Sequence, residues 1–119
     1  MRLPLLFVAV VALALGTASP AQADRRSDAK SQLEFGIAVA QRNLWKEATL
    51  RWERATEIDP RYGAAWNNLA IGYERLGRFD DARRAYDKAL EIEPGNSFIL
   101  NNYALFREIY DRQNRRRDR

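Results

Sequence analysis

Two pairs of asparagines carry the side chains whose chemistry most directly indicates binding. Asn67-Asn68 and Asn101-Asn102 lie 34 residues apart. A primary amide offers two N–H donors and one carbonyl acceptor, so it can pair with the N–H and C=O groups of a peptide running in either direction. Such contacts do not depend on the sequence of the bound chain. The four amides therefore indicate a surface that could hold a polypeptide backbone.

Aliphatic residues accompany these amides at helical spacing. Ile71 follows the first asparagine pair by about one turn, Leu105 follows the second pair, and Ile37 holds the matching position one period earlier. Arg75 lies one further turn beyond Ile71. An exposed aliphatic row would add weak selectivity for apolar side chains. Single exposed aliphatic residues are also common on protein surfaces, so an ordinary solvated face remains the alternative.

The arginine-rich end of the chain is the second candidate site. Residues 112–119 contain five arginines and no apolar residue. Such a segment could contact an anionic envelope surface. No aromatic residue is interleaved for base stacking, so nucleic acid is not an expected partner. The alternative is a frayed end that only aids solubility. The residues concerned are Arg112, Arg115, Arg116, Arg117 and Arg119.

The composition excludes the common catalytic and metal-binding groups. The chain has 119 residues, a net charge of +4, no Cys and no His. Imidazole acid–base catalysis, thiol nucleophiles and the usual zinc ligand sets are therefore absent from the sequence. The acidic pair Asp80-Asp81 is explained by the electrostatics of a helix start. We expect no enzyme activity, no cofactor and no metal site.

The first 23 residues have the three parts of a secretory signal peptide. Met1-Arg2 is positive, Leu3 to Gly16 is apolar without a charge, and Ala21-Gln22-Ala23 is an A-x-A cleavage pattern. The apolar run is shorter than the ~20 residues that a spanning helix needs. We expect cleavage after Ala23 and export to the periplasm or the medium. Retention of the segment as an anchor or a buried helix is the alternative.

The rest of the chain repeats itself with a period of 34 residues. Residues 29–62 align with residues 63–96 without a gap, so that Pro60 falls on Pro94. A fixed period of this size is typical of a solenoid. Each unit has the apolar spacing of two helices, with the first helix of the first unit expected over residues 32–42. Asn43 and Gly77 supply the positive φ that a tight turn between the helices requires, and the prolines end each unit.

These units resemble the tetratricopeptide repeat family. The resemblance implies an all-α solenoid of antiparallel helix pairs, in which alanines allow close approach and aromatic residues fill the gaps between units. The second unit carries it through Trp66, Leu69, Tyr73, Gly77, Phe79, Ala82, Tyr86, Ala89 and Pro94. The first unit carries it through Phe35, Gly36, Trp45, Ala48, Trp52, Ala55 and Pro60.

The expected organisation has six parts. A signal peptide over residues 1–23 and a linker over 24–28 precede the repeats at 29–62 and 63–96. A capping helix over residues 97–112 and a disordered arginine-rich tail over 113–119 follow. We expect Leu100, Tyr103 and Ala104 to form the inner face of the capping helix. Such a short array is expected to be a monomer, with dimerisation or a partner as alternative sources of stability.

The resemblance also implies where a partner binds. In this family the first helices of successive repeats line a concave groove that holds a peptide or a partner helix. Carried over to this chain, the groove has a floor of Ile37, Ile71 and Leu105. It is flanked by Asn67, Asn68, Asn101, Asn102 and Arg75. The carboxylate clamp of some family members is not expected, because its basic positions hold Leu33, Phe98 and Asn102.

The sequence therefore predicts a non-enzymatic, exported adaptor or scaffold that binds a protein or peptide partner in a concave groove. The alternative is a structural component of an envelope assembly that docks through its repeat faces. In a second form of that alternative, the arginine tail tethers the protein to an anionic surface. The two classes differ in salt response, because tail tethering weakens as ionic strength rises and apolar groove binding does not.

Overall fold

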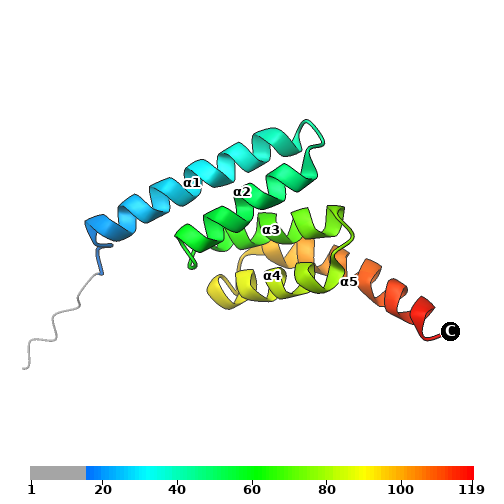
Figure 1. Ribbon diagram of the computed structural model, residues 1–119. Helices are drawn as coiled ribbons and strands as arrows, with labels where there is room; N and C mark the ends of the chain where they lie inside the picture. The colour runs from blue at the N-terminus through cyan, green and yellow to red at the C-terminus, as the bar shows by residue number, and fades with distance from the viewer. Residues whose placement is uncertain (1–15) are drawn as a thin grey trace, which may run out of the picture.

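The computed structural model describes residues 16–119, and these residues form five α-helices and no strand (Figure 1). This confirms the all-α fold. The helices stack as antiparallel neighbours along the molecule, and the C-terminal end of the last helix projects from one end of the stack. Their bounds are α1 Pro20–Ala40, α2 Trp45–Ile58, α3 Gly63–Arg75, α4 Phe79–Ile92 and α5 Ser97–Arg117.

The turns follow the sequence expectations. Asn43 between α1 and α2 has φ 60°, and Gly77 between α3 and α4 has φ 74°. Both residues adopt the left-handed conformation that asparagine and glycine tolerate best. Helices α2 and α4 end two residues before Pro60 and Pro94, because proline can neither donate the next hydrogen bond nor fit behind the preceding turn.

The indole of Trp52 on α2 is the central packing group of α1, α2 and α3. Trp52 is 3% exposed. Its Nε1–H donates to the carbonyl of Leu33 on α1 at 3.1 Å. The ring lies against Gly36 of α1 and Gly72 of α3, and a Cβ at Gly36 would come closer than 3.0 Å to three ring atoms. The two glycines therefore let α1 and α3 pack directly on the faces and edge of one buried indole.

Small alanines line the remaining contacts between paired helices. Ala48 and Ala55 of α2 and their counterparts one period later, Ala82 and Ala89 of α4, are completely buried. Side chains of this size allow two helix backbones to approach closely, as the sequence predicts. Tyr86 of α4 takes the place of Trp52 in the second unit and is also buried.

Helix α1 begins earlier than the sequence indicates. The expected linker over residues 24–28 is helical, and the helix starts at Pro20 rather than at residue 32. A capping box causes the early start, because the Ser19 and Gln22 side chains accept hydrogen bonds from each other's backbone N–H groups. The extension packs on the α2–α3 turn through Arg26, which contacts Asp59 at 2.6 Å and the ring of Tyr62 at 4.4 Å.

Most of the expected signal peptide, residues 1–15, lies outside the described residues. Its expected cleavage site after Ala23 falls within the first turn of α1. Cleavage there would remove the capping box and leave the contacts of Arg26 in place. Within residues 16–119, no helix combines the length and the apolar character that membrane crossing requires.

The inner face of α5 differs from the expected one. Ile99 and Phe106 are buried, whereas Leu100 is 45% exposed and Ala104 is exposed. Phe106 lies one period after Gly72, and both residues pack on the second helix of the preceding unit. Leu100 and Ala104 fall one period after Trp66 and Ala70 of α3, the helix that pairs with α4 in the second unit. Among the described residues no helix follows α5, so this side stays uncovered.

Helix α5 is also longer than expected. It continues to Arg117, so residues 113–117 of the expected disordered tail are helical. The segment contains no proline or glycine, and arginine is a good helix former. Arg115, Arg116 and Arg117 lie in the last turn, where the helix dipole favours positive charge. Tyr110 fixes the start of this extension by donating to Asp80 at 3.0 Å.

The close approach at Trp52 makes its two glycines sensitive to substitution. Gly36→Ala gains about 1 kcal/mol of helix propensity but forces a methyl group into the indole, which costs about 1–3 kcal/mol. We expect Gly36→Ala and Gly72→Ala each to lower the melting temperature by several degrees in thermal unfolding. Gly95→Ala is the matched control, because nothing lies within 4 Å of its Cβ position. Equal melting temperatures for all three variants would contradict this packing.

The register of α5 is tested by a pair of truncations. Phe106→Ala removes a ring that is 0% exposed, so we expect a loss of about 3–5 kcal/mol in the free energy of unfolding. Leu100→Ala changes a half-exposed side chain and is expected to cost less than about 1 kcal/mol. Denaturant titrations measure both. A larger loss of stability for Leu100→Ala than for Phe106→Ala would contradict this packing and support the inner face expected from the sequence.

Candidate functional site

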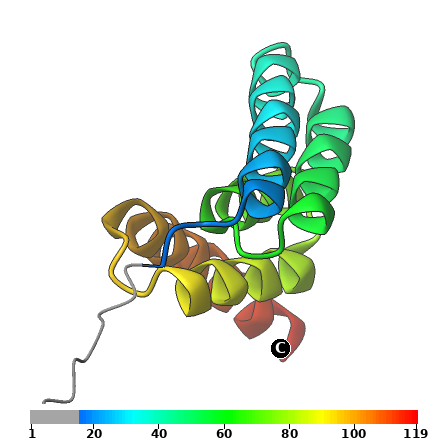
Figure 2. The same cartoon turned by 90° about the vertical axis from the view of Figure 1, so that its left-hand side faces the viewer.

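The first, third and fifth helices lie on the inner side of a bend in the stack. In the view turned by 90°, α2 and α4 lie on the outer side, and α1 and α5 border the inner side (Figure 2). This arrangement places the predicted groove residues of α3 and α5 next to each other. Ile37 on α1 is exposed but lies apart from the hollow described below.

One asparagine of each predicted pair joins the two helices. Asn102 on α5 donates from Nδ2 to Oδ1 of Asn67 on α3 at 3.2 Å. Asn67, Asn68 and Asn102 are half-buried, and Asn101 is exposed. The bridge uses one donor of Asn102 and one lone pair of Asn67, so both amides keep further hydrogen-bonding capacity. The sequence predicts these residues as ligand-binding groups but does not predict that two of them hold α3 and α5 together.

A hollow of about 520 Å³ opens beside this bridge between α3, α4 and α5. Four of the eight predicted groove residues line it, namely Ile71, Arg75, Asn102 and Leu105. Leu105 is 64% exposed, so its side chain forms an accessible wall. Asn67, Asn68, Asn101 and Ile37 are not among the lining residues.

The hollow exists because α5 stands away from the rest of the stack. Gly72 lets α3 approach α2 closely, whereas the matching residue of α5 is Phe106. The rings of Phe106 and Tyr86 pack with their centroids 5.3 Å apart, which keeps the backbones of α4 and α5 separated. Fewer close backbone approaches therefore join α5 to α4 than join α3 to α2.

Four lining residues were not predicted as site residues: Glu74, Phe79, Tyr86 and Ile109. Phe79 and Tyr86 were expected as packing residues, and they are also the floor of the hollow. The helical spacing of the sequence does place Ile109 on the groove face, four residues after Leu105. No sequence signal separates Glu74 from an ordinary exposed carboxylate on a helix.

Glu74 is a half-buried acid at the base of the hollow. The hydroxyl of Tyr86 donates to its Oε2 at 2.5 Å. Burial raises the pKa of Glu74, although this hydrogen bond and the nearby Arg75 oppose the shift. Burial and the same carboxylate raise the pKa of Tyr86 far above the usual phenol value, so Tyr86 remains a neutral donor.

Arg75 forms the rim of the hollow. Its guanidinium lies over the ring of Trp45, 4.8 Å from the centroid. Stacking of this kind holds the charge in a fixed place at the surface and leaves the N–H groups at the edge of the plane free for other partners.

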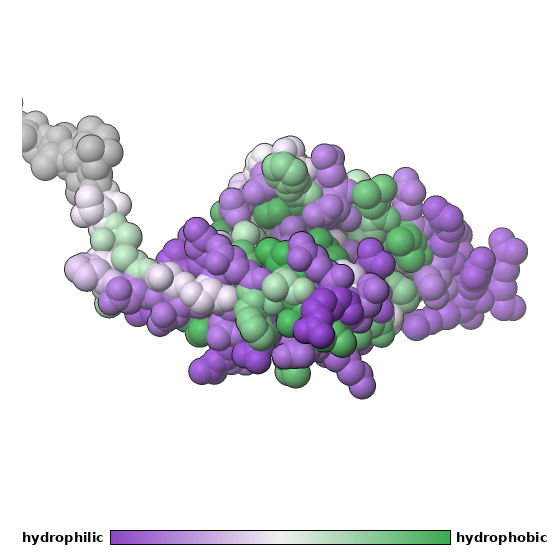
Figure 3. All heavy atoms as spheres, turned by 90° about the horizontal axis from the view of Figure 1, so that it is seen from above, coloured by the Kyte–Doolittle hydropathy of each residue, from purple (hydrophilic) through white to green (hydrophobic). Residues whose placement is uncertain are grey.

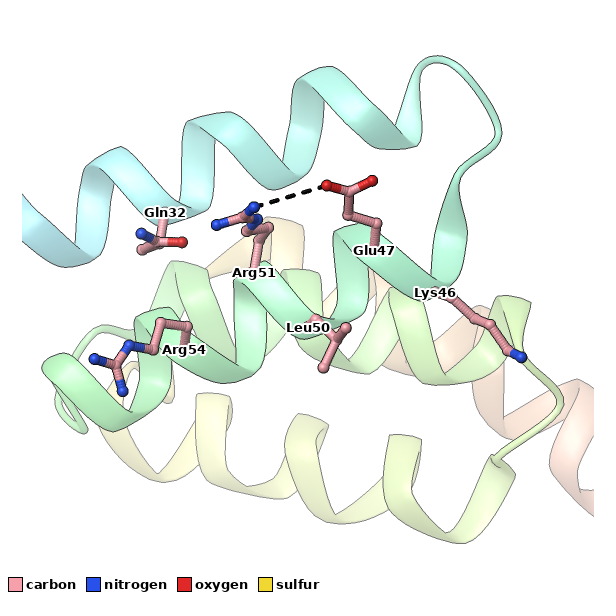
Figure 4. Close-up of a pocket in the computed structure, with 6 residues that line it drawn as sticks. All are labelled: Gln32, Lys46, Glu47, Leu50, Arg51 and Arg54. Atoms are coloured by element: carbon pink, nitrogen blue, oxygen red, sulfur yellow. Dashed lines mark ion pairs between the residues drawn. The ribbon is translucent and has the colours of Figure 1, made fainter.

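A second hollow lies at the other end of the stack, between α1 and α2 (Figure 4). Its lining is largely charged, and Arg51 forms an ion pair with Glu47 at 3.7 Å. Leu50 is its exposed aliphatic residue, at 63%. None of the predicted site residues lines this hollow.

The tail arginines lie on a helix rather than on a disordered segment. Arg112, Arg115, Arg116 and Arg119 surround one shallow hollow, which is consistent with their i, i+3, i+4, i+7 spacing. Arg117 lies on another side, next to Phe79 and the α3–α4 turn. Hydrophilic residues accordingly cover the end of the molecule that α5 forms, with hydrophobic residues adjoining them (Figure 3).

The comparison with protein families matches residues 63–96 to the tetratricopeptide repeat. These residues are α3, α4 and the turn that leads to α5. The chain belongs to the tetratricopeptide repeat family. Its helix pairs are tetratricopeptide repeats, and the side bordered by α1 and α5 is the inner side of the repeat array.

Two bacterial relatives are named as an assembly protein and a biogenesis protein. The type IV pilus assembly protein PilF of Pseudomonas aeruginosa is 30% identical over 93 residues, which are 76% of this chain and 37% of that protein. Its solved structure superposes with a TM-score of 0.70 over 75% of this chain and 40% of the other. The cytochrome c-type biogenesis protein CycH of Bradyrhizobium diazoefficiens is 34% identical over 72% of this chain and 24% of its own length.

The part of this chain that matches PilF and CycH therefore covers less than half the length of either protein. An archaeal protein of Methanocaldococcus jannaschii is closer in size, with 31% identity over 49% of this chain and 67% of its own length. Within residues 16–119, no group of three or more acidic residues is placed to hold a metal ion.

The burial of Glu74 predicts a specific pH dependence. The pKa of Glu74 is higher in the folded state than in the unfolded state. Below about pH 4.5 the carboxyl group is protonated in the folded state, so its burial carries no charge penalty. As pH rises through the folded-state pKa, the buried carboxyl group ionises and the free energy of unfolding falls. Glu74→Gln cannot ionise, so its free energy of unfolding relative to the native chain should increase between about pH 4.5 and pH 7. Denaturant titrations at both pH values measure this difference.

Glu108→Gln is the control for that experiment, because the Glu108 side chain is 67% exposed. Its free energy of unfolding should stay close to that of the native chain, because exposed ion pairs contribute little. A Glu74→Gln difference that stays constant or shrinks as pH rises would contradict a raised pKa.

Proposed function

We propose that this chain is a non-enzymatic adaptor that holds a peptide segment or a partner helix on the inner side of its repeat array. The hollow between α3 and α5 is the observation that carries the proposal. It combines exposed aliphatic side chains with the amide of Asn102, which keeps free hydrogen-bonding groups beside its bridge to Asn67. An exposed apolar wall of this kind stabilises a complex by losing water when a partner covers it.

Two kinds of side chain make the proposed contacts. Leu105, Ile71 and Ile109 would bury an apolar side chain of the partner over the rings of Phe79 and Tyr86. The asparagines would pair with the partner's backbone, which requires no particular partner sequence. This division favours a partner recognised by one or two apolar anchors rather than by a long exact sequence.

Three observations support the wider proposal. Two of the relatives are an assembly protein and a biogenesis protein, which accords with an adaptor or scaffold role. The absence of Cys and His from the sequence leaves few groups for catalysis. The apolar run from Leu3 to Gly16 and the Ala21-Gln22-Ala23 pattern support export, and hence a partner in the envelope or outside the cell.

The decisive variants are two leucine truncations. Leu105→Ala and Leu50→Ala remove the same atoms from side chains of nearly equal exposure, 64% and 63%, in the two different hollows. We expect Leu105→Ala to weaken partner binding by about tenfold and Leu50→Ala to leave it unchanged. The partner is first captured by photo-cross-linking from position 109, and its affinity for each variant is then measured by calorimetry.

Loss of binding in Leu50→Ala with normal binding in Leu105→Ala would move the site to the hollow between α1 and α2. The role of the amides is tested in the same assay with all four asparagines changed to Ala. Each lost hydrogen bond is worth about 0.5–1.5 kcal/mol, so we expect at least about a tenfold weaker complex. A thermal melt of that variant separates lost binding from the loss of the bridge between α3 and α5.

A further inference from the structure

The inner face of α5 continues well beyond the groove. Phe98, Leu105, Ile109, Arg112, Arg116 and Arg119 follow one another at intervals of seven, four, three, four and three residues. Such intervals keep every side chain on one side of an α-helix. The extension of α5 to Arg117 therefore places the arginines in line with the wall of the hollow instead of on a separate flexible tail.

This face changes character along its length. Its first three turns carry exposed apolar side chains, with Phe98 at 78% exposure and Leu105 at 64%, beside Asn101 and Asn102. Its last two turns are basic, with Arg112 and Arg116 on this face and Arg115 bordering the same hollow. The hollow of α3 and α5 ends at Ile109, and the hollow among the arginines begins one turn later at Arg112.

The arginines are free to take an external partner. Arg112 makes a 3.6 Å ion pair with Glu108, but both side chains are about two thirds exposed, and such pairs contribute little. Within residues 16–119, no carboxylate is in ion-pairing distance of Arg115, Arg116 or Arg119. The planar guanidinium groups are suited to bidentate contacts with carboxylates.

We infer that the partner held in the groove is a polypeptide segment with an apolar cluster followed by an acidic cluster. Its aliphatic residues fill the hollow beside Leu105, and its Asp or Glu residues lie on Arg112, Arg115 and Arg116. This inference rests on the proposed function and names the chemistry of the partner. Charge complementarity along one continuous helix face carries it.

The length of the face fixes the spacing of the two clusters. Leu105 and Arg115 are ten residues apart on α5, which corresponds to about 15 Å. A helical partner covers this distance with about ten residues, and an extended partner covers it with about four or five. The acidic cluster therefore lies at one of these two distances from the apolar anchor.

A single segment fits this surface better than a lipid bilayer. The apolar part of the site is recessed, with Ile71 half-buried and the rings of Phe79 and Tyr86 at its base. A flat surface cannot reach such a floor, whereas one side chain of a peptide can. The basic part contains no aromatic residue for stacking, which disfavours single-stranded nucleic acid.

The test is a display selection of random 16-residue peptides on the full chain. We expect the selected peptides to share an aliphatic cluster and an acidic cluster at one of the two spacings. The charge-reversal variant Arg115→Glu with Arg116→Glu should bind these peptides about tenfold more weakly and should select peptides with a basic cluster instead. The apolar cluster should be unchanged.

The matched control is Arg83→Glu with Arg84→Glu, which reverses the same charge at exposed positions of α4. It should select the same acidic peptides as the native chain. A second variant, Asn114→Pro, keeps every arginine but interrupts α5 before the last turn. It should lose the acidic preference if the arginines act as a helical face, and keep it if they act as a flexible tail.

The outcomes distinguish failure of this inference alone from failure of the proposed function. Selected peptides that need Leu105 but show no acidic cluster would keep the groove and overturn the inference. An acidic preference that survives the reversal at Arg115 and Arg116 would overturn it as well. Failure to select any peptide would contradict both. Binding to phosphatidylglycerol vesicles that depends on Arg115 and Arg116, without an acidic peptide preference, would assign the arginines to a membrane instead.

Discussion

The packing of one indole between two glycine backbones is the constraint on which the structure depends. Trp52 belongs to α2, but its ring touches Gly36 of α1 and Gly72 of α3, and its Nε1–H donates to α1. One side chain therefore fixes the relative positions of three helices. Tyr86 takes the same place one period later, where it donates to Glu74 of α3 and packs on Phe106 of α5.

The difference between these two centres produces the candidate site. Glycine at position 72 allows close approach, whereas phenylalanine at position 106 holds α5 at a distance. The space that results is closed at one side by the amide bridge between Asn67 and Asn102 and stays open between Ile71 and Leu105. A single change in residue size at a repeated position thus opens the hollow that forms the candidate site.

Features set by short-range rules were predictable from the sequence. The positive φ of Asn43 and Gly77, the helix ends before the prolines and the buried alanines all follow from local geometry and the 34-residue period. The face of α5 was not predictable in this way, because its packing depends on which neighbouring helices are present. The burial of Glu74 and the pairing of two asparagines depend likewise on the distance between α3 and α5. The helical tail was missed because arginine-rich ends resemble disordered segments in composition, although nothing in residues 112–117 interrupts a helix.

The most direct test of the account is methyl NMR of the chain with a selected peptide bound. The leucine and isoleucine methyl groups report separately on the two hollows and on both ends of the molecule. The account predicts that binding shifts the signals of Ile71, Leu105 and Ile109 and leaves those of Leu44 and Leu50 unchanged. Shifts confined to Leu44 and Leu50 would place the partner against α1 and α2 and would contradict the assignment of the site to the face between α3 and α5.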